Sequence, residues 1–441
     1  MIFPMPMQQE IVVHADQVVR KGVDHFFGID LNYIRDEDSN RPFARPLTQA
    51  LKDMGTRWLR FPGGEKSDYH RWSLPPYTKP APQSLGWYAT VKGNRMDFDS
   101  YLRIVKAIGA EPYVVVGYGS TALTGLTKAQ WIADAVAWVR YSNILKKSKV
   151  LYWEIGNENW NGDKATPTEM AGIVKEFSIA MKSVDPSIKV GASGNNDRWW
   201  SELLPISAPY LDFLSLSQYD GWSWNSYTHF IEKPDLTDTA VGAIRAIGRF
   251  APVADRSRLE VIVAETNTKD YTKSGWPDRN DLGHALVTFA TLGHLVAQPK
   301  IKAAMVWTTR WMNDDEASTS PFYALGPKND LLPTGRAIAL WGQFANPLLV
   351  SCNDDDTYAT RTQDGKQITV WIENREPLSR NIHLKIDGPF SFGNVGMHRF
   401  CGKADTDCSP TWSVLPSMAL HGNSVDEVSP PLSITVLSFV R

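Results

Sequence analysis

The stretch VLYWEIGNEN, residues 150–159, decides the fold. Residues 150–155 form a short apolar run, and the polar residues that follow it lead into a segment with apolar residues at helical spacing, 168–184. That segment stops at Asp185-Pro186, a typical helix end. A short apolar strand followed by an amphipathic helix is the repeating unit of a parallel β/α fold.

The same alternation continues on both sides of this unit. Further strands are predicted at residues 25–34, 57–62, 112–117, 189–192, 213–218, 259–264 and 303–308. Helices are predicted at residues 46–54, 97–108, 128–147, 237–250, 280–297 and 335–344. Eight strands with intervening helices in residues 21–346 predict an α/β chain with a (β/α)8 TIM barrel.

Outside the barrel the periodicity changes from helical to alternating. Residues 367–372, 380–386 and 433–439 alternate apolar and polar side chains, with Gly, Pro and Asp between them. This pattern predicts a C-terminal β-sandwich over residues 347–441. Residues 10–19 alternate in the same way, so we expect the N-terminal segment, residues 1–20, to cross over and join the sandwich.

Composition limits the partners. The net charge is −2, with 43% hydrophobic and 21% charged residues, so nothing favours nucleic acid or an anionic membrane surface. No run approaches the roughly 20 apolar residues that a membrane span needs. Seventeen Trp and fifteen Tyr suit a neutral sugar partner, because the C–H faces of sugars stack on aromatic rings.

The sequence says less about the cellular compartment, the pairing of the cysteines and the oligomeric state. The N-terminus MIFPMPMQQE lacks a basic region followed by a long apolar one. We therefore expect either a secreted or periplasmic protein whose signal precedes this numbering, or a cytoplasmic one. Cys401 and Cys408 flank GKADTD and could close a small disulfide loop, leaving Cys352 free. The oligomeric state stays open.

Polar side chains follow the ends of several predicted barrel strands, where the working face of such a barrel lies. They are Arg60, Asn157, Glu158, Tyr219, Glu265 and Trp307. A lone glutamate after a strand is usually a solvated loop residue, so it is the coincidence of these six that points to a site. Glu154 and Glu260, within or beside strands, are interpreted as interior or packing residues.

Two carboxyl groups facing each other across a barrel mouth suit glycosidic cleavage. We predict Glu158 as the acid/base and Glu265 as the nucleophile, about 5–5.5 Å apart as retaining chemistry requires. Arg60 would keep the nucleophile ionised and Tyr219 would orient it. Asn157 would donate to the sugar 2-hydroxyl and Trp307 would form the floor of the site. This chemistry needs no cofactor and no metal.

The motifs resemble clan A of the glycoside hydrolases. WEIGNEN (residues 153–159) and VIVAET (261–266) are similar to its acid/base and nucleophile segments. LRFPGGEKSDYHRWS (59–73) and the two-part layout resemble families 39 and 51. The resemblance implies retaining chemistry and the roles given above. Two departures concern furanosidase activity: family 51 arabinofuranosidases carry PGGN where this chain has PGGE, and GNEMDGPW where it has GNENWNGD.

The substrate is predicted from the aromatic residues near the barrel loops. They are Trp72, Trp87, Tyr88, Trp160, Trp199, Trp200, Trp222, Trp224, Trp276 and Trp311. Stacking platforms spread over a face favour endo-acting hydrolysis of a β-linked polysaccharide, of the β-glucan or xylan type, with Trp160, Trp222 and Trp311 contacting the chain. The alternatives are an exo-acting α-L-arabinofuranosidase or β-xylosidase, and, in another class, a non-catalytic carbohydrate-binding barrel.

Overall fold

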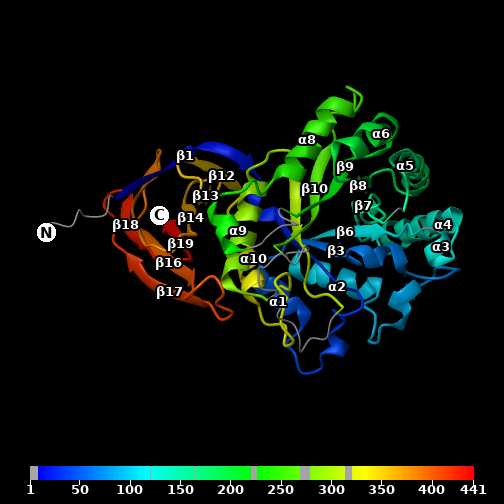
Figure 1. The fold of residues 1–441 in the computed structure, drawn as a ribbon, viewed down its shortest axis with the longest axis horizontal. Coiled ribbons are helices and arrows are strands. Elements are labelled where there is room, and N and C mark those ends of the chain that lie inside the picture. Colours follow the sequence, from blue (N-terminus) through cyan, green and yellow to red (C-terminus); the bar gives the residue numbers. More distant parts are fainter. Residues whose placement is uncertain (1–7, 120, 163, 220–225, 269–278, 313–319) are drawn as a thin grey trace.

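A computed structural model describes residues 8–119, 121–162, 164–219, 226–268, 279–312 and 320–441. The chain forms a barrel and a separate nine-stranded sheet that lie side by side (Figure 1). Among the helices within these ranges, none combines the length and apolar character needed to cross a membrane.

The barrel predicted from the sequence is confirmed. Eight strands close in the order β10-β11-β2-β3-β6-β7-β8-β9, and each pairs in parallel with its neighbours. They are β2 (Phe27–Asp30), β3 (Trp58–Phe61), β6 (Glu111–Val116), β7 (Tyr152–Ile155), β8 (Lys189–Ser193), β9 (Phe213–Gln218), β10 (Glu260–Thr266) and β11 (Ile301–Val306).

Helices surround this barrel (Figure 1). The longer ones are α1 (Leu47–Met54), α2 (Phe98–Ile108), α4 (Lys128–Val139), α5 (Pro167–Lys182), α6 (Asp197–Ser207), α8 (Asp238–Phe250), α9 (Leu282–Val296) and α10 (Pro333–Gly342). Short elements are η1 (Val23–His25), η2 (Asp38–Asn40), η3 (Glu65–Tyr69), the pair β4 (His70–Arg71) and β5 (Gln83–Ser84), η4 (Gly86–Thr90), α3 (Thr121–Thr124), η6 (Ala208–Tyr210) and α7 (Tyr227–Ile231).

One predicted helix needs correction, and one helix is additional to those predicted. The helix predicted at residues 128–147 is α-helical only to Val139 and continues as the π-helical turn η5 (Arg140–Leu145). Helix α6 lies where a sugar-binding loop was expected, since its first turn holds the Trp199-Trp200 pair. Asn196 caps α6 by accepting from the backbone N–H of Trp199 (2.9 Å), a typical helix start.

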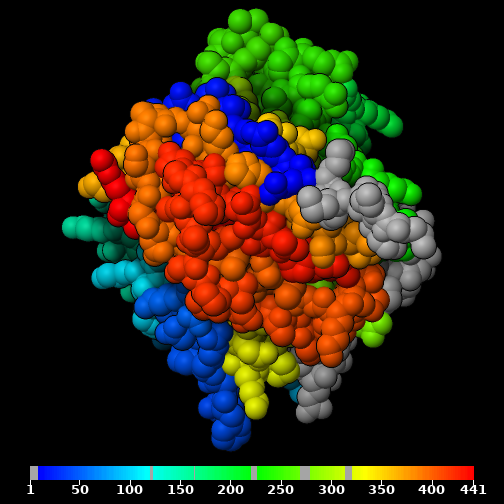
Figure 2. Space-filling model, turned by 90° about the vertical axis from the view of Figure 1, so that its left-hand side faces the viewer, coloured from blue at the N-terminus to red at the C-terminus, as the bar shows by residue number. Residues whose placement is uncertain are grey.

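The second unit is a mixed sheet in the order β17-β16-β19-β14-β13-β12-β1-β15-β18. Its strands are β1 (Gln9–Lys21), β12 (Leu348–Cys352), β13 (Thr357–Arg361), β14 (Gln367–Asn374), β15 (Arg380–Asp387), β16 (Asn394–Cys401), β17 (Thr411–Met418), β18 (Ser424–Ser429) and β19 (Ser433–Val440). The edge strand β18 contacts β14 and β19, so the sheet curls into two layers. These C-terminal strands cover one end of the molecule (Figure 2).

The expected crossover of the N-terminal segment is confirmed. Strand β1 pairs antiparallel with β12 and parallel with β15, between two strands more than 300 residues away in sequence. Its inward side chains Ile11, Val13 and Ala15 are fully buried. Burying a Val or Ile side chain stabilises a fold by about 1.5–3 kcal/mol, which is why the alternating pattern specifies this position.

The sheet packs against the barrel through helices α9 and α10. Trp341 of α10 lies 4.7 Å from Trp371 of β14 and stacks on Phe289 of α9 at 5.0 Å between ring centroids. The Trp371 Nε1 donates to the Leu340 carbonyl (2.9 Å). Since these rings are buried, one side of the sheet joins the apolar core of the barrel, while its other side has a core of its own around Ile11 and Val13.

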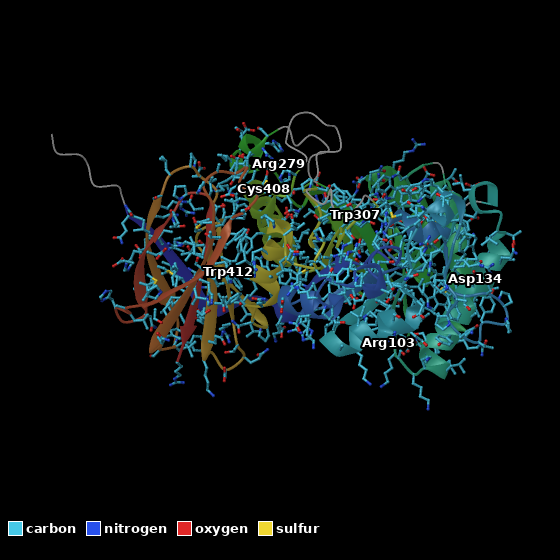
Figure 3. All side chains as sticks on the ribbon, turned by 90° about the horizontal axis from the view of Figure 1, so that it is seen from below. Arg103, Asp134, Arg279, Trp307, Cys408 and Trp412 are labelled. Carbon is cyan, nitrogen blue, oxygen red and sulfur yellow. The ribbon has the colours of Figure 1, made fainter. Side chains whose placement is uncertain are left out.

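The disulfide considered for Cys401 and Cys408 does not form, and Cys352 is free as well. Asp407 closes the loop between Cys401 and Cys408 instead. Its carboxylate accepts from the backbone N–H groups of Lys403 (3.0 Å) and Ser409 (2.9 Å). The loop reaches the start of α9, where the carbonyl of Asp407 accepts from the N–H of Leu282 (2.9 Å). Cys408 therefore lies beside the barrel, near Arg279 (Figure 3).

Candidate active site

The polar residues predicted from strand ends do gather at one end of the barrel. Arg60 lies on β3, Glu265 lies on β10, and the others follow β7, β9 and β11. Because all barrel strands are parallel, their carboxyl ends meet at the same mouth. Trp307, after β11, lies well away from the sheet residue Trp412 (Figure 3).

Arg60 is the centre of the site and is 1% exposed. Its Nη1 donates to Glu265 Oε1 (2.7 Å) and to Asp30 Oδ2 (3.2 Å). Its Nη2 donates to Glu154 Oε2 (2.8 Å) and to Asn157 Oδ1 (2.7 Å). One guanidinium therefore holds three buried carboxyl groups and the amide next to Glu158.

Asp30 was not among the predicted site residues, although it is the only charged side chain in the apolar run FFGIDL (residues 26–31). Burial raises the pKa of Asp30 well above its usual value, and Arg60 offsets part of that rise. Glu154, interpreted from the sequence as an interior residue, is 1% exposed. Burial also raises the pKa of Glu154, and the positive charge of Arg60 offsets part of this rise.

Glu265 is held through both carboxylate oxygens. Oε1 accepts from Arg60, and Oε2 accepts from the Tyr219 hydroxyl (2.7 Å). Gly64 lies directly against this carboxylate: a Cβ at position 64 would be 2.8 Å from Glu265 Oε1 and 3.2 Å from Trp307 Nε1. The glycine of the PGGE turn thus lets the backbone approach the carboxylate and the indole together.

Glu158 has different surroundings. Its Oε1 accepts from the Ser217 hydroxyl (2.5 Å) and its Oε2 accepts from Asn161 Nδ2 (3.4 Å). Burial, with a further contribution from the charge of Glu265, raises the pKa of Glu158 to about 7. A carboxyl group with this pKa is suited to donate a proton near neutral pH and take it back. Ser217 was not predicted, because it lies within strand β9.

Aromatic side chains flank the carboxyl groups. Trp307 stacks on Phe322 (4.7 Å, 13° between planes) and lies 4.9 Å from Trp311. The Lys66 ammonium lies 4.3 Å above the Trp311 ring, a cation–π contact. Trp160 lines a cavity of about 230 Å³ together with Asn195, Ser217, Tyr219 and Thr239. This cavity lies next to both carboxyl groups, since Ser217 bonds to Glu158 and Tyr219 to Glu265.

The predicted set of stacking platforms needs correction at four of its ten positions. Four of these aromatics belong to the core: Trp72, Tyr88, Trp199 and Trp200. The last two are buried because α6 packs them on Gly194, where a Cβ would lie 2.4 Å from Trp199. Trp87 is 62% exposed. Trp222, Trp224 and Trp276 lie outside the described residues.

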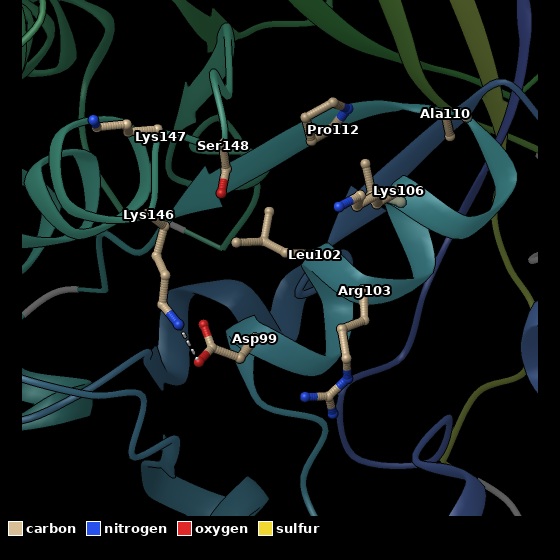
Figure 4. Close-up of a pocket in the computed structure, with 11 residues that line it drawn as sticks. Asp99, Leu102, Arg103, Lys106, Ala110, Pro112, Lys146, Lys147 and Ser148 are labelled. Carbon is tan, nitrogen blue, oxygen red and sulfur yellow. Dashed lines mark hydrogen bonds and ion pairs between the residues drawn. The ribbon is translucent and has the colours of Figure 1, made fainter.

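A larger cavity of about 580 Å³ lies elsewhere, between α2 and the segment before β7 (Figure 4). Its lining includes Gly109 and Pro112 near the start of β6, and the ion pair of Lys146 with Asp99 (2.9 Å). This is the amino end of the strands, opposite the carboxyl groups described above, so it is not the candidate site. In the described part of the chain, no three His, Cys, Asp or Glu side chains are grouped to hold a metal.

Residues 50–240 match the family described as the α-L-arabinofuranosidase 1 domain. The chain is 27% identical over 258 residues to α-L-arabinofuranosidase C of Emericella nidulans. It is 23% identical over 248 residues to an intracellular exo-α-(1→5)-L-arabinofuranosidase of Acetivibrio thermocellus. Both matches cover 52% of this chain and 48% of the relative, so they span only about half of each relative's length.

The whole fold has a counterpart in the family 51 α-L-arabinofuranosidase of Thermotoga petrophila, with a TM-score of 0.78. That alignment covers 97% of this chain and 99% of the other, at 19% identity. The chain thus resembles clan A glycoside hydrolases, and among them family 51. The fold is that of a TIM barrel with a β-sandwich.

Proposed function

We propose that this chain is a retaining glycoside hydrolase that removes terminal α-L-arabinofuranosyl units. The observation that carries the proposal is the contrast between two carboxyl groups at one barrel mouth. Burial raises the pKa of Glu158 to about 7, whereas Glu265 is bonded to Arg60 and Tyr219. Such a pair provides a proton donor and, opposite it, a nucleophile held by a guanidinium and a hydroxyl group.

In the proposed reaction, a Glu265 oxygen attacks the anomeric carbon while Glu158 gives its proton to the leaving oxygen. The glycosidic C–O bond breaks and a covalent glycosyl-enzyme forms. Glu158, now a carboxylate, takes a proton from water as the water oxygen attacks the same carbon and releases Glu265. Two inversions give net retention of configuration.

The other predicted residues take supporting roles in this proposal. Arg60 and Tyr219 keep Glu265 in place, and Asn157, itself bonded to Arg60, donates to the sugar 2-hydroxyl. Trp307 forms the floor under the reacting sugar. Trp160 and Trp311, both half-buried, contact the substrate at the sides of the site.

An arabinofuranoside replaces the β-linked polysaccharide that the sequence favoured. The endo-acting interpretation depended on many aromatic platforms, and four of those side chains lie in the core. The relatives carry arabinofuranosidase names, one of them with exo action. Both points support the exo-acting alternative over hydrolysis of β-glucan or xylan.

Two measurements test the proposal. The wild-type chain is incubated with an aryl α-L-arabinofuranoside, and NMR follows the anomeric configuration of the first product. Separate incubations with arabinan, xylan and β-glucan are analysed for the size of the products. We expect arabinose monomer released with retained configuration, and no release by Glu265→Gln. A ladder of oligomers from xylan or β-glucan would favour the endo-acting alternative. Binding of glycans without turnover of any glycoside would favour the non-catalytic one.

A further inference from the structure

The turn that carries Glu158 is held by an ion pair that takes no part in the proposed reaction. Asp68 belongs to η3, which follows β3, and is fully buried. Its Oδ2 accepts from Lys164 Nζ (2.6 Å), and its Oδ1 accepts from the backbone N–H of Asn157 (3.0 Å). Lys164 also donates to the carbonyl of Asn157 (2.8 Å). Both polar backbone groups of Asn157 are therefore bound to one ion pair.

This backbone needs such support. Glu158 has φ of +42°, in the left-handed region that non-glycine residues rarely adopt. A strained conformation persists only where its surroundings fix it. Asp68 is itself fixed, because its Oδ1 also accepts from the N–H of Tyr118 (3.3 Å), and a Cβ on Gly119 would lie 2.6 Å from its carbonyl.

Lys164 also acts on Glu158 through its charge. Glu158 faces Glu265 from β10, Ser217 from β9, and Asn161 and Lys164 from its own loop. Burial and the charge of Glu265 raise the pKa of Glu158, while Ser217, Asn161 and Lys164 lower it. Lys164 in turn faces Asp68 and Glu65 of η3, and its side chain is 8% exposed. It is thus a nearly buried cation that favours release of the proton from Glu158.

We propose that Asp68 and Lys164 are positioning residues, which hold the acid/base turn in the geometry needed for proton transfer to the leaving group. This inference rests on the proposed function, since it takes Glu158 as the proton donor. Neither residue touches the reacting atoms. Their effect passes through the peptide between Asn157 and Glu158, and through the electrostatic field at the Glu158 carboxyl group.

The test compares two aryl α-L-arabinofuranosides on the same enzyme preparation. A dinitrophenyl leaving group needs no protonation, whereas an unsubstituted phenyl leaving group does. We expect Lys164→Met and Asp68→Asn to lower the ratio of kcat/KM for phenyl over dinitrophenyl at least about tenfold, since general acid catalysis contributes about 10²–10⁴. The ratio does not depend on how much of the preparation is folded, so a loss of stability alone leaves it unchanged.

The pH profile gives a second readout. Lys164→Met removes a charge that lowers the pKa of Glu158. The alkaline limb of the pH profile of kcat/KM for the phenyl substrate should therefore shift to higher pH. Lys164→Arg keeps the charge and should keep the limb close to wild type. If Lys164→Met does not fold, Lys164→Gln provides the uncharged variant.

Lys182 offers a matched control, because its Nζ lies 2.6 Å from Asp212 Oδ2, an oxygen that also accepts a backbone N–H from Val190. That pair lies at the amino end of β9, so Lys182→Met should leave the substrate ratio unchanged. Unchanged ratios and pH profiles in the Lys164 and Asp68 variants would overturn this inference alone. Absence of hydrolysis of either substrate by the wild-type chain would overturn the proposed function instead.

Discussion

Replacing Arg60 by Met removes the charge that three buried carboxyl groups share. Arg60 bonds to Asp30, Glu154 and Glu265, and its side chain is 1% exposed. Met has a similar length but carries no charge, so it fills much of the space and leaves the three carboxyl groups without their cation. Breaking a buried ion pair by removing one partner costs about 3–5 kcal/mol. For 441 residues the unfolding entropy is about 0.9 kcal/mol per kelvin, so we expect Tm at neutral pH to fall by about 3–5 °C.

The stability loss in Arg60→Met should depend on pH. Burial raises the pKa of Asp30 and of Glu154, and Arg60 counteracts this in both. Without Arg60 both acids hold protons more tightly in the folded chain than in the unfolded one. Lowering the pH therefore stabilises the folded variant more than the folded wild type. The difference in Tm should be largest near pH 8 and should shrink towards about pH 5.

Thermal unfolding followed by tryptophan fluorescence, at several pH values and constant ionic strength, measures this difference. Arg71→Met is the control, because Arg71 is largely buried and its carboxylate partner among the described residues is Asp134. We expect the difference in Tm between this control variant and the wild type to vary less with pH. A loss in Arg60→Met below about 1 kcal/mol, or one that stays constant from about pH 5 to about pH 8, would refute the reasoning.

Further predictions concern activity. Glu265→Ala should abolish turnover of aryl glycosides, and azide should restore part of it as a glycosyl azide of inverted configuration, identified by NMR. Glu158→Ala should retain glycosylation only with good leaving groups, and azide should then give a product of retained configuration; the opposite pattern would mean that the two roles are exchanged. Because the reaction needs protonated Glu158, whose pKa is raised to about 7, kcat/KM should fall as the pH rises above about 7. Gly64→Ala places a Cβ 2.8 Å from Glu265 Oε1 and 3.2 Å from Trp307 Nε1, so kcat/KM should fall about tenfold or more, while an equal rate in both proteins would contradict the contact.

Much of the architecture was predictable because it depends on local periodicity. Each barrel strand is a short apolar run followed by a helix, and β1 shows its buried face through the alternation of Ile11, Val13 and Ala15. Helix α6 escapes prediction for the same local reason: in the sequence Trp199 and Trp200 resemble a sugar platform, but in the fold they pack on Gly194 and are buried. The sequence alone cannot show which aromatic side chains are covered, because burial depends on how the helices pack, and α6 packs against α5 and α8.

The amino-acid sequence shows which residue types end the barrel strands, and in what order, and that order pointed to Glu158 and Glu265. The folded barrel was needed to show that Arg60 bonds to three carboxyl groups, that Ser217 donates to Glu158, and that Asp68 and Lys164 hold the backbone of Asn157. Strands can be recognised in the sequence because burial of one face of a strand repeats along the chain at a fixed spacing. The electrostatic surroundings of a carboxyl group come instead from residues that only the closed barrel brings together.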